Sequence, residues 1–164
     1  MTNEFVLEAI TREFPESVLA SSEPHGLLTV EVKKDDLKKI VHYLRDSSLG
    51  FNFLTDVTGV HYPENKDMEI GAVYHLQNMV ANFRIRLKAF MPETNPEIDS
   101  LVELFAGANW MERETYDFFG IKFKGHPDLR PILNMEDLGY HPMLKQYKLE
   151  DGTRTDKDDT MFGR

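Results

Sequence analysis

The sequence contains no cysteine, and this absence removes several kinds of chemistry at once. Disulfides, thiolate nucleophiles, cysteine-ligated zinc and iron–sulfur clusters all need thiol groups. If the protein works beside an iron–sulfur cluster, another chain must therefore hold that cluster. Long apolar runs are also missing, since no stretch approaches the roughly 18 residues of a membrane helix. Residues 1–4 are acidic where a secretion signal would be basic, so we expect a cytoplasmic chain without direct membrane insertion.

Positive charge is in deficit. Lys and Arg number 19 against 28 Asp and Glu, which gives a formal net charge of −9. A surface of this sign repels nucleic acid and anionic lipid, so we expect no nucleic-acid partner. The 164 residues are enough to enclose one hydrophobic core. A neutral or basic ligand, or another protein, is the expected partner.

Motifs that hold nucleotides or activate nucleophiles are missing as well. Neither Gly-x-Gly-x-x-Gly nor Gly-x-Ser-x-Gly occurs. Residues 120–125 have the glycine spacing of a phosphate-binding loop, but His126 and Pro127 replace the Lys-Ser/Thr that contacts phosphate and magnesium. The 6 histidines are scattered without a His-x-x-x-His pair. We therefore expect no metal and no cofactor in this chain, and we expect His126 and His141, each before a proline, to bond turn backbone.

Apolar periodicity predicts an α+β fold. Helical spacing indicates four helices, at residues 3–14, 35–44, 95–107 and 109–119. Asn3, Asn95 and Asn109 are the expected N-caps, and Glu112 would complete a capping box. Alternating or β-rich stretches indicate strands at residues 17–21, 27–32, 51–60, 69–76, 82–90 and 121–123. Because the connections are hairpin-sized, we expect a mostly antiparallel sheet with helices on one face, plus an irregular C-terminal extension.

The chain divides by composition near residue 120. Residues 1–120 form the expected α+β domain. Residues 121–164 are punctuated by Gly and Pro and form the expected extended C-terminal segment. Within this segment, residues 151–160 contain no core-forming side chain, so we expect them to be disordered in isolation.

The densest charged cluster is predicted on the fourth helix. Glu114 and Asp117 would lie one turn apart, and Arg113 would reach Asp117 at i+4. One interpretation is an acid/base pair in a freestanding enzyme. The other is a solvated helix face, which is typical of such charges. From composition and spacing alone, an interaction or scaffold domain is favoured over an enzyme.

A family resemblance starts at this cluster. Residues 112–130 run Glu-Arg-Glu, two further positions, Asp, apolar residues, Gly, a short Phe-containing strand, Gly-His-Pro and Leu-Arg. Residues 139–147 give a second block, in which a His-Pro turn leads to Lys145 and an aromatic residue. With the stretches at 53–63 and 73–76, the chain resembles the thirty-kilodalton (C) subunit of the proton-pumping NADH:quinone oxidoreductase, respiratory complex I. It departs from the family at Pro131, where members commonly have a second basic residue, and at Lys145, where Arg is frequent.

The resemblance implies a non-catalytic structural and assembly subunit in the hydrophilic arm of that complex, which transfers electrons from NADH to quinone and translocates protons. FMN and iron–sulfur clusters are then expected in partner subunits. The expected partners of this chain are other hydrophilic-arm subunits, chiefly the subunit beside the quinone site. The expected location is peripheral, on the cytoplasmic side of the cell membrane, with residues 121–164 wrapping a partner. The interface residues that the resemblance implies are Glu112, Arg113, Glu114, Asp117, His126, Arg130, His141 and Lys145.

Two alternatives stay open. The chain could be the equivalent subunit of a related complex, either a ferredoxin-dependent plastoquinone reductase or a membrane-bound hydrogenase. It could also be a freestanding acid/base enzyme that uses Glu114 and Asp117.

Overall fold

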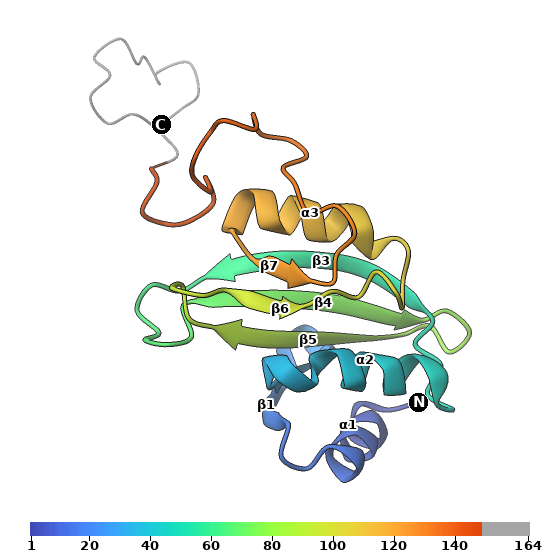
Figure 1. Ribbon diagram of the computed structural model, residues 1–164. Helices are drawn as coiled ribbons and strands as arrows, with labels where there is room; N and C mark the ends of the chain where they lie inside the picture. The colour runs from blue at the N-terminus through green and yellow to red at the C-terminus, as the bar shows by residue number, and fades with distance from the viewer. Residues whose placement is uncertain (149–164) are drawn as a thin grey trace, which may run out of the picture.

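The computed structural model describes residues 1–148, and Figure 1 shows the arrangement of their helices and strands. The helices are α1 (Asn3–Glu13), α2 (Leu37–Asp46) and α3 (Ala108–Phe119). The strands are β1 (Val18–Ser22), β2 (Leu28–Val32), β3 (Phe53–His61), β4 (Ile70–Asn78), β5 (Phe83–Met91), β6 (Glu97–Asp99) and β7 (Lys122–Lys124). Short 3₁₀ turns occupy Pro24–Gly26 and Lys34–Asp36. The expected disorder of residues 151–160 concerns residues outside the described part.

Five strands form one sheet in the order β1-β2-β5-β4-β3, and β6 pairs with β7 in a second, small sheet. In the five-stranded sheet the pairs β1–β2, β3–β4 and β4–β5 are antiparallel, while β2 and β5 run parallel. The antiparallel partners are joined by short connections, whereas the chain reaches β5 from β2 only after α2, β3 and β4. The predicted α+β class with a mostly antiparallel sheet is confirmed.

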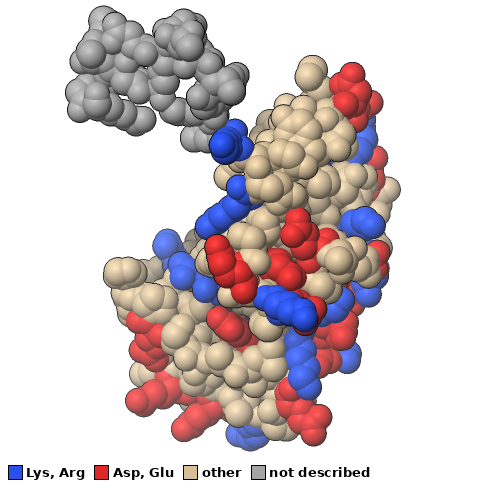
Figure 2. All heavy atoms as spheres, turned by 90° about the vertical axis from the view of Figure 1, so that its left-hand side faces the viewer, with Lys and Arg blue, Asp and Glu red and all other residues tan. Residues whose placement is uncertain are grey.

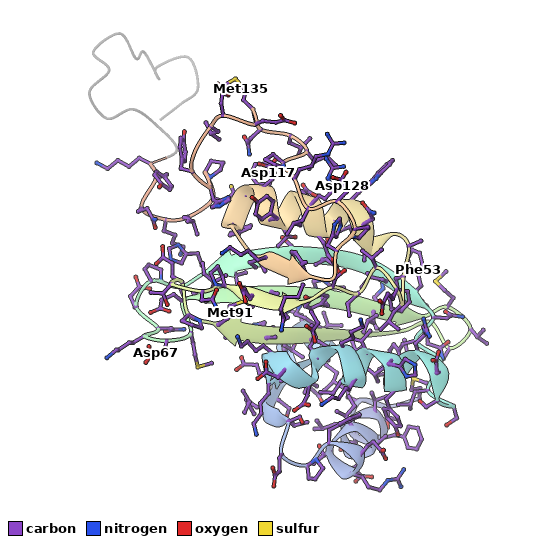
Figure 3. All side chains as sticks on the ribbon, in the orientation of Figure 1. Phe53, Asp67, Met91, Asp117, Asp128 and Met135 are labelled. Atoms are coloured by element: carbon purple, nitrogen blue, oxygen red, sulfur yellow. The ribbon has the colours of Figure 1, made fainter. Side chains whose placement is uncertain are left out.

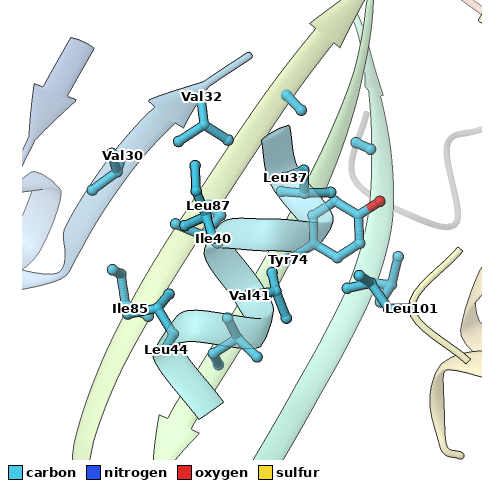
Figure 4. Close-up of a cluster of buried hydrophobic side chains, with 14 of the residues drawn as sticks. Val30, Val32, Leu37, Ile40, Val41, Leu44, Tyr74, Ile85, Leu87 and Leu101 are labelled. Carbon is cyan, nitrogen blue, oxygen red and sulfur yellow. The ribbon is translucent and has the colours of Figure 1, made fainter. Parts of the chain in front are cut away.

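One face of the sheet carries the hydrophobic core. The strand register places Val30, Leu87, Tyr74 and Val57 side by side across β2, β5, β4 and β3, and all four are buried. The helix α2 lies over this face, as Figure 4 shows. Its apolar stripe is completely buried and consists of Leu37, Ile40, Val41 and Leu44. The i, i+3, i+4, i+7 spacing of these residues is what makes α2 amphipathic and directs it onto the sheet.

The other face of the sheet is polar along β5, as the alternation of this strand predicts. Arg84, Arg86 and Lys88 alternate with buried apolar residues. Arg86 Nε donates to His75 Nε2 at 2.8 Å, and His75 Nδ1 lies 3.4 Å from a carboxylate oxygen of Asp56 on β3. Burial and then the Arg86 guanidinium lower the pKa of His75 below its usual value. The imidazole is therefore neutral at pH 7 and accepts the arginine hydrogen bond.

The helix predicted at residues 95–107 is wrong. Residues 97–99 form β6, which pairs in parallel with β7, and turns follow it. Ile98 and Leu101, which were expected on a helical stripe, are still buried, but they face the core from a strand and a turn. Backbone groups in the first half of this stretch are bonded to distant residues: Lys122 N donates to Pro96 O, and Leu101 N donates to the Glu112 carboxylate. A tertiary contact therefore overrides local spacing.

Two helix starts also differ from the prediction. The N-cap of α1 is Thr2 rather than Asn3, and its hydroxyl accepts from Phe5 N at 3.3 Å. The helix α3 starts at Ala108 after Gly107, without a side-chain cap. Glu112 does not complete a capping box, because its carboxylate binds Ser100 and Leu101 instead. Side chains that could cap a helix are thus used for tertiary contacts.

Replacing Tyr74 by phenylalanine is expected to stabilise the protein. The Tyr74 side chain is 0% exposed, and its hydroxyl has no hydrogen-bond partner among residues 1–148. Removing a buried, unsatisfied hydroxyl from a filled site should raise the free energy of unfolding by about 1 kcal/mol. Urea denaturation of Tyr74→Phe measures this change, with Tyr62→Phe, at a more exposed tyrosine, as the control. A loss of stability in Tyr74→Phe would mean that the hydroxyl has a bonding partner after all.

Candidate functional site

The helix α3 is fixed on β3, the edge strand of the sheet, at two points. Thr115 Oγ1 lies 3.1 Å from Val57 O and 2.8 Å from Met111 O of its own helix, so its one hydroxyl proton is shared between the two carbonyl groups. One turn further on, the Phe119 ring lies so close to Gly59 that a Cβ on Gly59 would come within 2.5 Å of it. The helix ends at Gly120, whose φ of 77° lies in the left-handed region that favours glycine. Because Gly59 and Val57 lie on the same face of β3 as the core, α2 and α3 cover the same side of the sheet, as predicted.

Asp117 ties the segment after β7 back to α3. Its carboxylate accepts backbone N–H bonds from Ile132, Leu133 and Asn134 at 2.8–3.0 Å, and an amide N–H of Asn134 at 3.0 Å. Burial by itself raises the pKa of Asp117, but the bonds from Asn134, Leu133 and Ile132 together outweigh burial, so this pKa lies below its ordinary value. The ionised carboxylate therefore serves as an internal anchor for residues 132–134.

Arg113 forms a second anchor and does not pair with Asp117 as predicted. Its Nε donates to Arg130 O at 3.1 Å, and its NH2 group donates to Pro131 O at 3.0 Å. Arg130 and Pro131 precede the residues that Asp117 holds. Two side chains of α3 thus fix one continuous stretch, residues 130–134, by its backbone.

Glu112 lies beneath this arrangement and is 0% exposed. Its carboxylate accepts from Ser100 Oγ and from Leu101 N, both at 2.7 Å. Burial raises the pKa of Glu112 to about 7, although the bonds from Ser100 and Leu101 act in the opposite direction. Glu112 therefore joins α3 to the turn after β6, and in the folded chain all its contacts are internal.

The two histidines of the predicted interface also bind backbone; His126 bonds its own turn, as expected, whereas His141 bonds a carbonyl of α3. His126 Nε2 lies 3.0 Å from Asn109 O, and His126 Nδ1 accepts from Asp128 N at 3.0 Å. His141 Nδ1 lies 2.9 Å from Asp117 O. Both rings therefore hold the chain after α3 against that helix.

The remaining predicted interface residues lie at the surface. Glu114 is exposed on α3. Arg130 pairs with Asp128 at 3.0 Å, and Lys145 Nζ lies 5.8 Å from the centre of the Tyr62 ring. The structure does not bring Glu114 and Asp117 together as an acid/base pair, because Asp117 is buried and its carboxylate is already bonded to residues 132–134.

The charge pattern did not predict the large apolar side chains that α3 and the following segment expose. Trp110 is 71% exposed, Leu133 66% and Met135 70%. Figure 3 shows Met135 on the part of this segment that lies away from the sheet, and Asp117 beside the helix. The signal that could have found this surface is Trp110, the one tryptophan of the sequence, on a helix whose other side packs on the sheet.

Replacing Arg113 by alanine is expected to lower the free energy of unfolding by about 1 kcal/mol, because two charge-assisted bonds to carbonyl groups are lost at a half-exposed position. Arg113→Lys should fall between alanine and wild type, since an ammonium group cannot reproduce the two-pronged geometry. Urea denaturation measures both. Arg12→Ala, at an exposed arginine of α1, is the matched control. Equal stability of Arg113→Ala and Arg12→Ala would contradict the anchor.

Metal ligands do not gather within residues 1–148, where no group of three His, Asp or Glu side chains could hold a metal ion. No helix in the same residues is long and apolar enough to cross a membrane.

Comparison with known proteins identifies relatives over most of the chain. Residues 30–153 match the family described as "Respiratory-chain NADH dehydrogenase, 30 Kd subunit". The NADH-quinone oxidoreductase C subunit of Geobacter metallireducens is 40% identical over 91% of this chain and 91% of its own length. The same-named protein of Nocardioides sp. is 45% identical over 76% of this chain, and the match spans 50% of that relative. The F(420)H(2) dehydrogenase C subunit of Methanosarcina mazei is 40% identical over 87% of this chain and 90% of its own length.

Solved structures agree with these matches. The trypsin-resistant fragment of Nqo5 superposes with a TM-score of 0.68 at 30% identity, covering 79% of this chain and 100% of the fragment. A chain of an archaeal membrane-bound sulfane sulfur reductase has a TM-score of 0.76 at 21% identity and covers 94% of this chain and 95% of its own, which shows the shared fold. The sequence matches and the fold together show that the chain belongs to the family of the 30 kDa subunit of respiratory-chain NADH dehydrogenase.

Proposed function

We propose that the chain is a structural and assembly subunit of the hydrophilic arm of an NADH:quinone oxidoreductase and performs no catalytic step itself. The arm would carry FMN and iron–sulfur clusters in other subunits, and the complex would couple electron transfer to proton translocation. The chain would lie at the cytoplasmic side of the membrane as a peripheral subunit, beside the subunit at the quinone site. Its relatives named as C subunits of NADH-quinone oxidoreductases support this assignment.

The observation that carries the proposal is how α3 uses its ionisable side chains. Glu112, Arg113 and Asp117 all bind within the chain and hold backbone in place. A catalytic acid or base needs access to a substrate, whereas the Glu112 and Asp117 carboxylates are buried and already accept bonds from internal partners. What the arrangement offers outward is a rigid surface, and a rigid surface suits binding to another subunit.

The direct experiment is affinity purification of the tagged chain from native membranes, followed by mass spectrometry. We expect a large complex that contains a flavin-bearing, NADH-oxidising subunit. The free full-length chain should have no flavin absorbance and no turnover. A freestanding enzyme would instead turn over by itself and lose that activity in Glu114→Gln.

The same experiment decides the electron donor of the complex. The Methanosarcina relative is named as part of an F(420)H(2) dehydrogenase, so family membership is compatible with more than one donor. A nickel-bearing partner would indicate the membrane-bound hydrogenase alternative. Ferredoxin dependence, without an NADH-oxidising subunit, would indicate the plastoquinone reductase alternative.

A further inference from the structure

The outer side of α3 and the segment after it form an apolar groove. The groove has a volume of about 230 Å³ and is lined by Trp110, Met111, Glu114, Ile132 and Leu133. Trp110 and Leu133 are more than half exposed, and so is Met135, two residues further along. On the face shown in Figure 2, which is the left-hand side of the view in Figure 1, charged side chains of both signs are spread over the lower part of the molecule and the upper part is mainly uncharged. Single exposed apolar residues are ordinary, but large ones gathered at a groove mark a binding surface.

The groove is held in shape from beneath. Ile132 and Leu133, which form one of its walls, are bonded to Asp117 through their backbone N–H groups. Arg113 fixes the two residues that precede them. The other wall is α3 itself, which Thr115 and Phe119 pin to β3. A surface that is already ordered loses little conformational entropy on binding, and tryptophan is among the residue types most enriched at binding hot spots.

Charge at the groove indicates what kind of occupant it takes. Glu114 lines the groove and is exposed. Glu136, whose side chain is 79% exposed, follows Met135, but it already lies 4.0 Å from the Arg130 guanidinium. A basic group on the occupant would therefore complement the Glu114 carboxylate. A second copy of this chain would instead bring the same carboxylate and a net charge of −9 to the same place.

We infer that this groove, the Trp110 groove, binds a segment of a neighbouring subunit that inserts an apolar side chain between Trp110 and Leu133 and places a Lys or Arg beside Glu114. The inference rests on the proposed function, because a neighbouring subunit is present only if the chain assembles into a complex. In this arrangement, apolar contacts in the Trp110 groove form the centre of the interface with the neighbouring subunit. Glu112, Arg113 and Asp117 then support that interface from within the chain.

Oxidative footprinting tests the location. The complex purified from native membranes and the free full-length chain are exposed to hydroxyl radicals, and the oxidation rates of individual residues are measured by mass spectrometry. Trp110 and Met135 should oxidise about tenfold more slowly in the complex, because the centre of an interface is packed as tightly as a protein interior. Met79, 56% exposed at the turn between β4 and β5, is the reference within the chain.

Photo-crosslinking tests the occupant. Leu133 is replaced by the photoreactive residue p-benzoylphenylalanine, and the complex is irradiated. The inference expects a crosslink to another subunit, at an apolar site with a Lys or Arg within a few residues. Val80, 93% exposed, carries the same photoreactive group in the control and should give no crosslink to that site.

The outcomes separate this inference from the proposed function. If the chain co-purifies with a complex but Trp110 oxidises there at the rate of the free chain, the inference is wrong and the proposed function stands. A crosslink from position 133 to residues 149–164 of the same chain, to a second copy, or to a segment without a basic residue also overturns it. If the chain is found in no complex, the proposed function fails and the inference fails with it.

Discussion

Replacing Asp117 by alanine is expected to detach residues 132–134 from α3. The substitution removes the common acceptor of three backbone N–H groups and of the Asn134 amide. Bonds to a charged acceptor are each worth more than neutral ones, so we expect a loss of about 3–5 kcal/mol in the local stability of this segment. Asp117→Asn keeps a neutral acceptor oxygen and should lose part of that amount.

Amide hydrogen exchange at Ile132, Leu133 and Asn134 measures this effect directly. Their protection should fall toward that of an unstructured chain in Asp117→Ala. The amides of β4 should keep theirs, because the core does not depend on Asp117. Asp137→Ala is the matched control, since Asp137 is an exposed aspartate of the same segment and its removal should change stability by less than about 0.5 kcal/mol. Unchanged protection in Asp117→Ala would contradict the anchoring role.

Glu112 should make the stability of the folded chain depend on pH across the neutral range. Burial raises its pKa from an ordinary value of 4.5 to about 7, so the folded chain binds this proton more tightly than the unfolded chain does. The stability that the folded chain gains by binding this proton is therefore fully present below pH 4.5, and it is lost as the pH rises toward 7. Linkage gives a total of about 3 kcal/mol over this interval.

Glu112→Gln isolates this contribution, because glutamine is neutral at every pH and has nearly the same shape. The difference in unfolding free energy between Glu112→Gln and wild type should shift by about 3 kcal/mol in favour of the variant between pH 4.5 and pH 8. Glu114→Gln, at the exposed glutamate one position past Arg113, should give no such shift. Asp117 acts with the opposite sign, but below its ordinary pKa of 3.8, so the two effects occupy separate pH ranges. A constant difference for Glu112→Gln across pH would contradict a buried, neutralised carboxyl group.

The sheet could be predicted from the sequence because its signal is local. Along β5 the residues alternate between apolar and basic with a period of two, and only a strand places them on opposite faces. Gly120 likewise ends α3 as predicted, because its left-handed backbone suits glycine. The stripe of α2 has helical spacing and is bounded by acidic residues at its start. In these three elements the residues that carry the sequence pattern are also the residues that determine the backbone conformation, and the predictions are confirmed.

The predicted helix at residues 95–107 fails because its pattern is ambiguous. Ile98 and Leu101 are three positions apart, which fits a helical face, but they reach the same core from a strand and a turn. Pairing with β7 and the bonds from Ser100 and Leu101 to Glu112 decide between the two conformations. These partners lie 11 or more residues away in the sequence, so no local window contains the deciding contact.

The predicted contact between Arg113 and Asp117 on α3 is absent for a similar reason. Helical geometry correctly places Arg113 and Asp117 one turn apart, but spacing does not reveal that the chain returns over both side chains. Once residues 130–134 lie on α3, carbonyl groups bind the guanidinium and N–H groups bind the carboxylate. Both are better satisfied by this backbone than by each other in water.

The measurement that most directly tests the structural role is the NADH:quinone reductase rate per assembled complex. A strain lacking this chain is complemented with wild type, Glu114→Gln or Asp117→Ala. Membrane extracts are then assayed for activity and for the amount of complex on a native gel. We expect Asp117→Ala to lower the amount of complex and the rate in the same proportion, and Glu114→Gln to keep the wild-type rate per complex. A variant that assembles in normal amount but has lost its rate would show that the chain takes part in the chemistry.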